Sequence, residues 1–284
     1  MLVILFRLLS HVPLSILHAI GMIAGWMVYR FSATYRFRLQ DNLTRAGLRT
    51  QLSAAVRESG KNIFELPFIW CAPPTKVLAT ARVEGWSVVE AAVERGRGVI
   101  FLTPHLGCFE IIAQVIASRI PLTALYRPPR QSFLKPLFEE ARRRPNLSLA
   151  PANLRGVRLL LKTLKAGGAI GLLPDQVPQN GEGVWADFFG KAAYTMTLPA
   201  KLQQMTNAPL VMSYAERLPA GEGFVVRFAS YETLPTLNLQ QQTEALNRAM
   251  ETLIRQCPAQ YFWGYNRYKT PAGVPPADAA KAQR

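Results

Sequence analysis

Apolar runs alternate with amphipathic segments through the middle of the chain, and this alternation limits the folds open to it. Strand-like runs span about 98–104, 122–128 and 168–176, and segments with helical spacing span about 85–96, 110–120 and 153–167. Two later runs flank a Pro-Ala-Gly-Glu turn and predict a hairpin, at 209–217 and 223–230. Strand–helix alternation places parallel strands beside one another, with helices on the faces of the sheet and a site at the carboxyl ends of the strands. We therefore predict an α/β fold with a mixed, partly parallel sheet flanked by helices.

The N-terminal segment predicts a membrane anchor. Between Arg7 and Arg30 lie 22 residues without a formal charge, which is roughly 33 Å of helix and enough to cross the hydrocarbon. No short apolar core with a small-residue cleavage site is present, so we expect the segment to be retained. Pro13, His11 and His18 interrupt it, which leaves a helix lying in the membrane interface as the alternative. The arginines that follow it place the rest of the chain in the cytosol by the positive-inside rule.

The net charge indicates which kind of partner the chain binds, and the cysteine spacing indicates its compartment. The chain has 33 Lys plus Arg against 18 Asp plus Glu, a net charge of +15, which favours an anionic partner. The sequence contains no recognisable nucleic-acid motif or aromatic stacking platform, so we expect lipid rather than nucleic acid. Cys71, Cys108 and Cys257 have no CxxC spacing, which suits a reducing compartment and makes neither a disulfide framework nor a zinc site.

His105 and Glu110 form the most suggestive pair in the sequence. His105 directly follows a predicted strand, and Glu110 falls in the first turn of the next helix, so both side chains can meet at the carboxyl end of the strand. A carboxylate on one imidazole nitrogen leaves the other free to accept a proton from a hydroxyl. We predict that Glu110 orients His105 and that His105 acts as the base. The alternative is a helix-capping histidine beside an unrelated surface glutamate.

Other chemistries lack their motifs. The chain has no G-x-S-x-G element and no phosphate-binding loop, because Trp185 stands where the first glycine of that loop belongs. A single histidine outside the N-terminal segment cannot build a metal site with unpaired cysteines. We therefore expect neither a metal nor a cofactor. A nucleophilic role for Cys108 remains a minor alternative, since its neighbours suggest burial.

A series of motifs in order resembles the lipid A biosynthesis acyltransferases. These are the late, or secondary, enzymes of the lauroyl and myristoyl type, within the wider lysophospholipid acyltransferase superfamily. The series runs through "RLQDNL", "HLGCFE", "ALYRPPR", "ARRRPN", "GLLPDQVPQNGEGVWADFFGKAAYT" and "CPAQYFWGYNRYKTPAGVPP". The resemblance covers nearly the whole chain. It implies a glycerolipid-acyltransferase-like fold, and the absence of an E-G-T-R-like element argues against a lysophosphatidate-type acceptor.

The resemblance also implies a reaction and its partners. A fatty acyl group would pass from acyl carrier protein, as a thioester co-substrate, to a hydroxyl on a primary acyl chain of a lipid A precursor or similar anionic glycolipid. The enzyme would work without a covalent intermediate, as a monomer, at the cytoplasmic face of the inner membrane. A backbone N–H near Gly107 or Cys108 at the start of the helix, or a nearby arginine, would hold the oxyanion. Another lysolipid acceptor, a lipid hydrolase with the same His/Glu pair, and a non-catalytic lipid-binding module remain alternatives.

Substrate-binding residues are expected around the same edge of the sheet. Guanidinium groups suit the phosphates of an acidic glycolipid, and polar side chains at the end of the strand 168–176 could face the cleft. The candidates are Arg127, Arg130, Arg142, Arg144, Asp175 and Gln176. A solvated basic surface is the alternative for the arginines, and loop capping is the alternative for Asp175. Phe188 and Phe189 suit an acyl-chain slot or the core, and the aromatics at 261–268 suit the membrane interface or the core.

One predicted helix carries a basic stripe. In the segment 153–167 four basic residues recur at spacings that place them on one helical face: Arg155, Arg158, Lys162 and Lys165. We predict that this face docks the acidic acyl carrier protein, with a solvated surface or lipid contact as the alternative. The chain divides into an N-terminal membrane anchor helix at 1–31, an acyltransferase domain at 32–270 and a disordered tail at 271–284.

Overall fold

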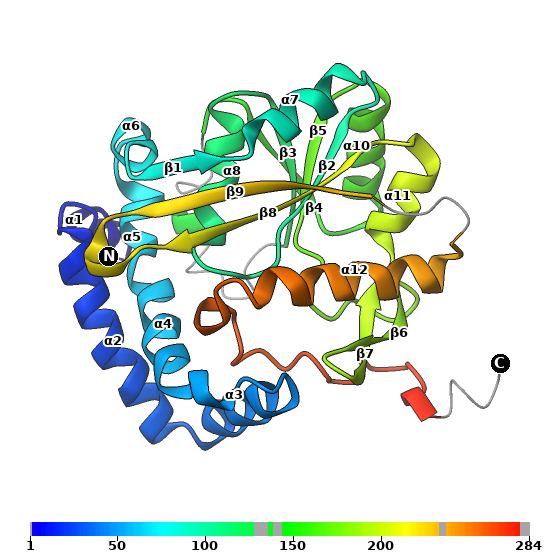
Figure 1. The fold of residues 1–284 in the computed structure, drawn as a ribbon. Coiled ribbons are helices and arrows are strands. Elements are labelled where there is room, and N and C mark those ends of the chain that lie inside the picture. Colours follow the sequence, from blue (N-terminus) through cyan, green and yellow to red (C-terminus); the bar gives the residue numbers. More distant parts are fainter. Residues whose placement is uncertain (1, 128–135, 139–143, 233–236, 279–284) are drawn as a thin grey trace.

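A computed structural model describes residues 2–127, 136–138, 144–232 and 237–278. Its centre is a seven-stranded sheet in the order β1-β9-β8-β2-β5-β3-β4 (Figure 1). All neighbouring pairs are parallel except β8 and β9, which form an antiparallel hairpin. The strands are β1 (Ala81–Glu84), β2 (Val99–Leu102), β3 (Leu122–Tyr126), β4 (Leu147–Pro151), β5 (Ala169–Leu172), β8 (Leu210–Arg217) and β9 (Phe224–Tyr231). The predicted α/β fold with a mixed, partly parallel sheet is confirmed.

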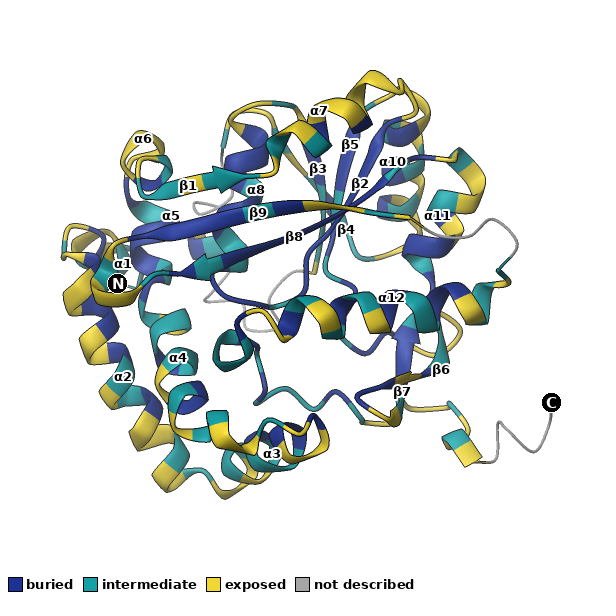
Figure 2. Ribbon diagram, viewed as in Figure 1, coloured by how far each residue is buried: buried dark blue, intermediate teal, exposed yellow. Residues whose placement is uncertain are grey.

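Helices cover both faces of the sheet because β2 is buried on both sides. Ile100 and Leu102 face one apolar cluster, whereas Val99 and Phe101 face the other, as the period of two requires. The first cluster is closed by α3 (Ala33–Arg45), α4 (Leu52–Phe64), α10 (Leu154–Lys165), α11 (Leu198–Thr206) and α12 (Leu239–Ile254). The second is closed by α1 (Leu2–Leu9), the start of α2 (Leu14–Phe31), α5 (Leu66–Cys71), α6 (Pro74–Leu78), α7 (Trp86–Glu94) and α8 (Phe109–Ala117). Figure 2 shows the central strands buried between these layers.

A smaller hairpin lies outside the main sheet. Its strands are β6 (Gly183–Phe188) and β7 (Lys191–Met196), and they pair antiparallel through a turn at Phe189 and Gly190. Three short 3-10 turns complete the described elements, namely η1 (Arg49–Gln51), η3 (Pro219–Gly221) and η4 (Pro258–Gln260). The hairpin packs against α12, where Asn247 Nδ2 donates to the carbonyl of Asp187 at 2.9 Å.

The N-terminal segment forms two helices instead of one. Pro13 has no N–H to continue α1, and it caps the beginning of α2. Among the residues that the structure describes, α2 is the one helix long and apolar enough to cross a membrane, by length and composition. It packs along α4, where Gly21 and Gly25 approach the backbone of Val56 and Gly60 so closely that a Cβ at either position would overlap it.

A buried ionic network ties these helices to the sheet. Glu65 at the start of α5 accepts from Arg217 Nε at 2.6 Å and lies 3.1 Å from His18 Nε2, and Arg217 also donates to Glu58 at 2.7 Å. Burial opposes ionisation of Glu65, but the guanidinium of Arg217 keeps the pKa of this carboxyl below its usual range. Arg217 closes β8, so the network joins α2, α4 and α5 to the end of a central strand.

Residues near the C-terminus are hydrogen-bonded to the β6–β7 hairpin and to the loop before it. The carbonyl of Gly273 accepts from Asn180 Nδ2 at 3.0 Å, and that of Pro275 accepts from Trp185 Nε1 at 3.0 Å. A disordered tail was predicted at 271–284; these contacts place Gly273 and Pro275 beside the loop before β6 and beside β6, and disorder of the tail stays a prediction. Residues 279–284 lie outside the described part of the chain.

Candidate active site

His105 and Asp175 meet at the carboxyl edge of the sheet. Strands β2 and β5 are parallel neighbours with Leu102 opposite Leu172, so the loops that follow them leave the sheet side by side. His105 comes three residues after β2, and Asp175 comes three residues after β5. Two residues that lie 70 apart in the sequence are thus brought together by strand pairing alone.

Asp175 holds His105 through two hydrogen bonds. Its Oδ1 lies 2.7 Å from the ring Nδ1, and its Oδ2 accepts from the backbone N–H of His105 at 2.8 Å. The carboxylate is 2% exposed and the imidazole 13%. Burial opposes ionisation of Asp175, but the charge of His105, its two hydrogen bonds and Arg267 hold the pKa of Asp175 below its usual range. An ionised, buried carboxylate therefore fixes the orientation of the ring.

The second ring nitrogen of His105 faces an amide. Gln176 Nε2 lies 3.0 Å from His105 Nε2. In this orientation the amide nitrogen can donate to a lone pair on Nε2, and the other ring nitrogen can donate to Asp175. The contacts suit a ring that carries its proton on Nδ1 and accepts a proton at Nε2. Phe109 and Phe262 flank the ring, with centroids 4.6 and 6.3 Å away.

Glu110 takes a different partner from the one predicted. It lies in the first turn of α8, as expected, but its Oε2 accepts from the indole Nε1 of Trp70 at 3.1 Å. His105 Nδ1 is hydrogen-bonded to Asp175 Oδ1 instead. The two predicted partners are five residues apart in the sequence, but the carboxylate that reaches the ring comes from the end of the neighbouring strand β5. A catalytic role for Glu110 stays a prediction.

The loop that carries His105 is fixed by backbone pairing. Phe262 N donates to the carbonyl of His105 at 3.1 Å, Gly107 N donates to that of Gln260 at 3.0 Å, and Cys108 N donates to that of Ala215 at 2.9 Å. Gly107 has φ of 62°, and a Cβ there would overlap the carbonyl of Ala215, so this position requires glycine. The N–H groups of Gly107 and Cys108 therefore already have acceptors, and the oxyanion site predicted near them stays a prediction that needs another donor.

Cys108 is a structural residue of this loop. The thiol is buried at 1% exposure, and burial, reinforced by the charge of Glu65, raises its pKa well above the usual value. A thiol must ionise to act as a nucleophile, so the geometry argues against the minor alternative of a cysteine nucleophile. Within the part of the chain that the structure describes, no three His, Cys, Asp or Glu side chains gather in a cluster that could hold a metal ion.

The predicted arginines are placed differently from one another. Arg127 is exposed directly after β3, at the same edge of the sheet as His105. Arg144 instead donates to the carbonyl of Trp70 at 2.7 Å and to Gln114 Oε1 at 3.2 Å, so its guanidinium braces α5 against α8. Arg130 and Arg142 lie outside the described residues. A phosphate-binding role for these arginines stays a prediction.

The basic stripe is confirmed as an exposed face of α10. The helix begins after β4, at the edge of the sheet that holds the site, and buries Leu160 and Leu164 against the core. All four basic side chains are exposed: Arg155, Arg158, Lys162 and Lys165. The stripe therefore starts at the site edge and runs away from it along α10.

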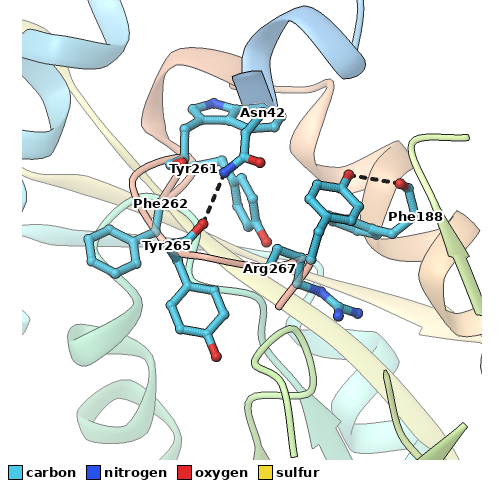
Figure 3. A pocket seen from close by; sticks show the side chains of 8 residues that line it. Asn42, Phe188, Tyr261, Phe262, Tyr265 and Arg267 are labelled. Carbon is cyan, nitrogen blue, oxygen red and sulfur yellow. Dashed lines mark hydrogen bonds between the residues drawn. The ribbon is translucent and has the colours of Figure 1, made fainter. Parts of the chain in front are cut away.

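The C-terminal aromatic cluster belongs to the core. Trp263 is 2% exposed, and Phe188 is 1% exposed. Figure 3 shows Asn42 and the aromatic rings around a small pocket, which leaves about 10 Å³ for a water-sized occupant and holds no more than one water. Packing thus accounts for residues that the sequence also allowed as a membrane belt or an acyl-chain slot.

Arg267 is the buried cation of this cluster. Its Nη1 donates to the carbonyl of Tyr194 at 2.9 Å, its Nη2 donates to Thr195 Oγ1 at 2.7 Å, and its guanidinium stacks over Phe188 at 5.0 Å. Its charge is one of the causes of the lowered pKa of Asp175. Arg267 therefore favours the ionised form of Asp175, a role that its place in the C-terminal motif did not reveal.

Fold and site together define a class of protein. A histidine base oriented by a buried carboxylate, at the carboxyl edge of a partly parallel sheet and without a nucleophilic cysteine, is suited to activating a hydroxyl or a water. The family model for bacterial lipid A biosynthesis acyltransferases matches residues 1–270. The chain belongs to this family and is an acyltransferase of lipid A biosynthesis.

Individual relatives are distant but cover most of the chain. It is similar to the lipid A biosynthesis lauroyltransferase of Escherichia coli K12, with 24% identity over 94% of this chain and 90% of the relative. The palmitoleoyltransferase of the same organism is 27% identical over 75% of this chain and 70% of the relative. The myristoyltransferase is 25% identical over 69% of this chain and 61% of the relative.

Proposed function

We propose that this protein transfers a fatty acyl group from acyl carrier protein to a hydroxyl on a primary acyl chain of a lipid A precursor, at the cytoplasmic face of the inner membrane. The observation that carries the proposal is the orientation of the His105 imidazole, with Nδ1 on Asp175 and Nε2 turned toward Gln176. The family match supports the acceptor class.

His105 Nε2 removes the proton of the acceptor hydroxyl as the oxygen attacks the thioester carbonyl. When the acceptor binds, its hydroxyl replaces the amide of Gln176 as the hydrogen-bond partner of His105 Nε2. The tetrahedral intermediate collapses with loss of the carrier's thiolate, which takes the proton back from the imidazolium, so no group on the enzyme is acylated. Asp175 keeps the proton on Nδ1 throughout and stabilises the transient imidazolium.

The oxyanion needs a donor other than Gly107 and Cys108. Phe109 is the first residue of α8, and its N–H has no acceptor among the described residues. Unpaired N–H groups in the first turn of a helix carry the positive end of its dipole. We assign this N–H the role of stabilising the oxyanion, beside the base in sequence.

The two substrates use different groups at the carboxyl edge of the sheet in this proposal. The exposed stripe on α10 attracts the acidic carrier, and its effect decreases with salt because screening acts over about 10 Å at 0.1 M. Arg127 receives an acceptor phosphate beside β3. The N-terminal helices hold the protein at the membrane that contains the acceptor. No cofactor enters this reaction, and a monomer supplies every group named.

The direct test supplies purified protein with acyl carrier protein thioester, with and without a hydroxylated lipid A precursor, and identifies the products by mass spectrometry. We expect an acylated glycolipid only when the acceptor is present, and we expect His105→Ala to reduce the rate by about 10²–10⁴-fold. Free fatty acid as the main product in both mixtures would instead show a hydrolase. A comparison of lipid A masses from cells with and without the protein then identifies the chain and its position.

A further inference from the structure

We propose that α2 lies in the surface of an anionic phospholipid bilayer and does not cross it, so that α1, α3 and the catalytic domain all remain on one side. The inference deepens the proposed membrane attachment and rests on it. It also decides between the two modes of attachment that the sequence left open.

The helices on either side of α2 pack onto the same domain. Phe6 of α1 stacks on Trp70 of α5, with ring centroids 6.0 Å apart, and Trp70 in turn donates to Glu110 at the site. At the other end, Asn42 of α3 donates to the carbonyls of Trp263 and Tyr265 at 2.7 and 2.9 Å. A helix that crossed the membrane would place α1 and α3 on opposite sides, and one of these contacts would be lost.

Contacts along α2 also fasten it to the domain over its length. The turn η3 touches its first residues, since a Cβ at Gly221 would overlap the backbone of Ser15. His18 faces inward to Glu65 at 3.1 Å, and Gln40 donates to Tyr29 Oη at 2.7 Å. If α2 crossed in this packed state, α4 would have to enter the hydrocarbon beside it, together with Arg57, Glu58 and Lys61. Burying such charges is too costly for a helix that can instead lie flat.

The outer side of α2 is an apolar face without a partner in the structure. Of the sixteen large hydrophobic side chains that are exposed in the described residues, twelve lie before residue 64. Patches of this extent on a soluble surface mark a membrane or protein interface. Figure 2 shows α2 at the edge of the molecule with exposed residues along its outer side. We define the lipid face as Ile16, Ile20, Ile23, Trp26, Met27 and Phe31.

The charge beside the lipid face selects an anionic bilayer as its occupant. Residues 1–64 carry eight basic side chains against two acidic ones. Arg30 adjoins the lipid face, with its guanidinium 5.8 Å from the ring centre of Phe31, and Trp26 packs edge-on against Tyr29. Aromatic rings at headgroup level with arginines beside them are typical of helices that lie in the membrane interface.

Topology is tested with cleavable tags on both termini of the full chain, expressed in cells. We expect external protease to spare both tags in intact spheroplasts and to remove both in inverted inner-membrane vesicles. Removal of the N-terminal tag in spheroplasts, with the C-terminal tag spared, would show a spanning helix and overturn the inference. The acyl-transfer assay in detergent micelles does not depend on topology, so its result judges the proposed function separately.

The lipid face is tested by binding to vesicles of phosphatidylethanolamine and phosphatidylglycerol. Ile23→Glu with Met27→Glu alters two side chains that are 64% and 56% exposed, and the matched control, Val93→Glu with Met205→Glu, alters two that are 41% and 59% exposed elsewhere. We expect the first pair to reduce the bound fraction at least about tenfold and the control to bind like the parent protein. Circular dichroism checks that both remain folded.

Two outcomes of the vesicle experiment would overturn the lipid face. One is unchanged binding by the Ile23→Glu, Met27→Glu protein. The other outcome concerns dimers in detergent-free buffer. If the parent protein is a dimer there, and the Ile23→Glu, Met27→Glu protein is a monomer that keeps its affinity for vesicles, the face joins two copies of the chain.

Discussion

Asp175 contacts His105 both at the backbone N–H and at the ring Nδ1, so one carboxylate sets the position of the residue and the direction of its ring. The carboxylate is buried, and the helices and strands around it leave it little freedom to turn away. The ring of His105 therefore depends on Asp175 for its orientation, and Glu110 contacts Trp70 instead of Nδ1.

Replacing Asp175 with Asn tests this dependence. The Asn side chain has an amide nitrogen to offer Nδ1, which moves the ring proton to Nε2 and removes the base, while the bulk of the side chain is unchanged. We expect kcat to decrease by about 10²–10⁴-fold with little change in the melting temperature. Asp187→Asn, at an exposed position of β6, is the matched control. A kcat within a few-fold of the parent value would remove Asp175 from the mechanism.

Glu110→Ala separates a role in the reaction from a role in packing. We expect turnover to decrease by orders of magnitude while the protein stays folded and bound to the membrane. Trp70→Phe removes the indole donor to Glu110 Oε2 and keeps an aromatic ring against Phe6. If the carboxylate acts on substrate, Trp70→Phe retains most of the activity that Glu110→Ala loses. Equal losses in the two proteins, measured with steady-state kinetics, would assign Glu110 to packing.

Arg217→Met tests the buried ionic network of Glu58, Glu65 and Arg217. The substitution leaves Glu65 buried without its guanidinium partner, and removing one member of a buried pair typically costs about 3–5 kcal/mol. Arg227→Met is the control, since its pairs with Glu84 and Glu216 are partly exposed and surface pairs contribute about 0–1 kcal/mol. Urea unfolding measures both. Similar midpoints for the two variants would contradict a stabilising role for the network.

Charge reversal on α10 tests the docking of the carrier. We expect Arg158→Glu with Lys162→Glu to raise KM for the acyl carrier protein thioester several-fold at low salt and less at high salt. A small thioester substrate should be used as before. Arg95→Glu with Arg97→Glu changes the net charge equally at the opposite edge of the sheet, before β2, and serves as the control. An equal loss with both donors would show that the stripe serves folding or membrane attachment.

Sequence patterns predicted the parts of the fold that are regular and strongly apolar. The predicted elements at β2, β3, β5, α7, α8 and α10 are confirmed, and so is the β8–β9 hairpin, because each has clear periodicity and end signals. Strand β4 and the β6–β7 hairpin were missed. β4 carries Pro151 at its end, and β6 combines Gly183 with charged Asp187, so neither run is continuously apolar.

The site was harder to predict because it depends on strand order. His105 was recognised from its own strand end, but choosing its carboxylate required knowing that β2 and β5 are neighbours. Asp175 was instead predicted as a substrate ligand. Pairing of the loop with Gln260 and Phe262 likewise joins distant residues through backbone atoms, and side-chain patterns carry no information about such contacts.

The bond between Phe262 N and the carbonyl of His105 has a consequence during synthesis. About 150 residues separate His105 from Phe262. At about 5–20 residues per second, His105 therefore emerges from the ribosome roughly 8–30 s before its backbone partner. Throughout that interval the N-terminal helices are already available to the membrane, while the loop that carries His105 lacks this backbone partner. We therefore expect chains truncated before Phe262 to reach the bilayer without acyltransferase activity.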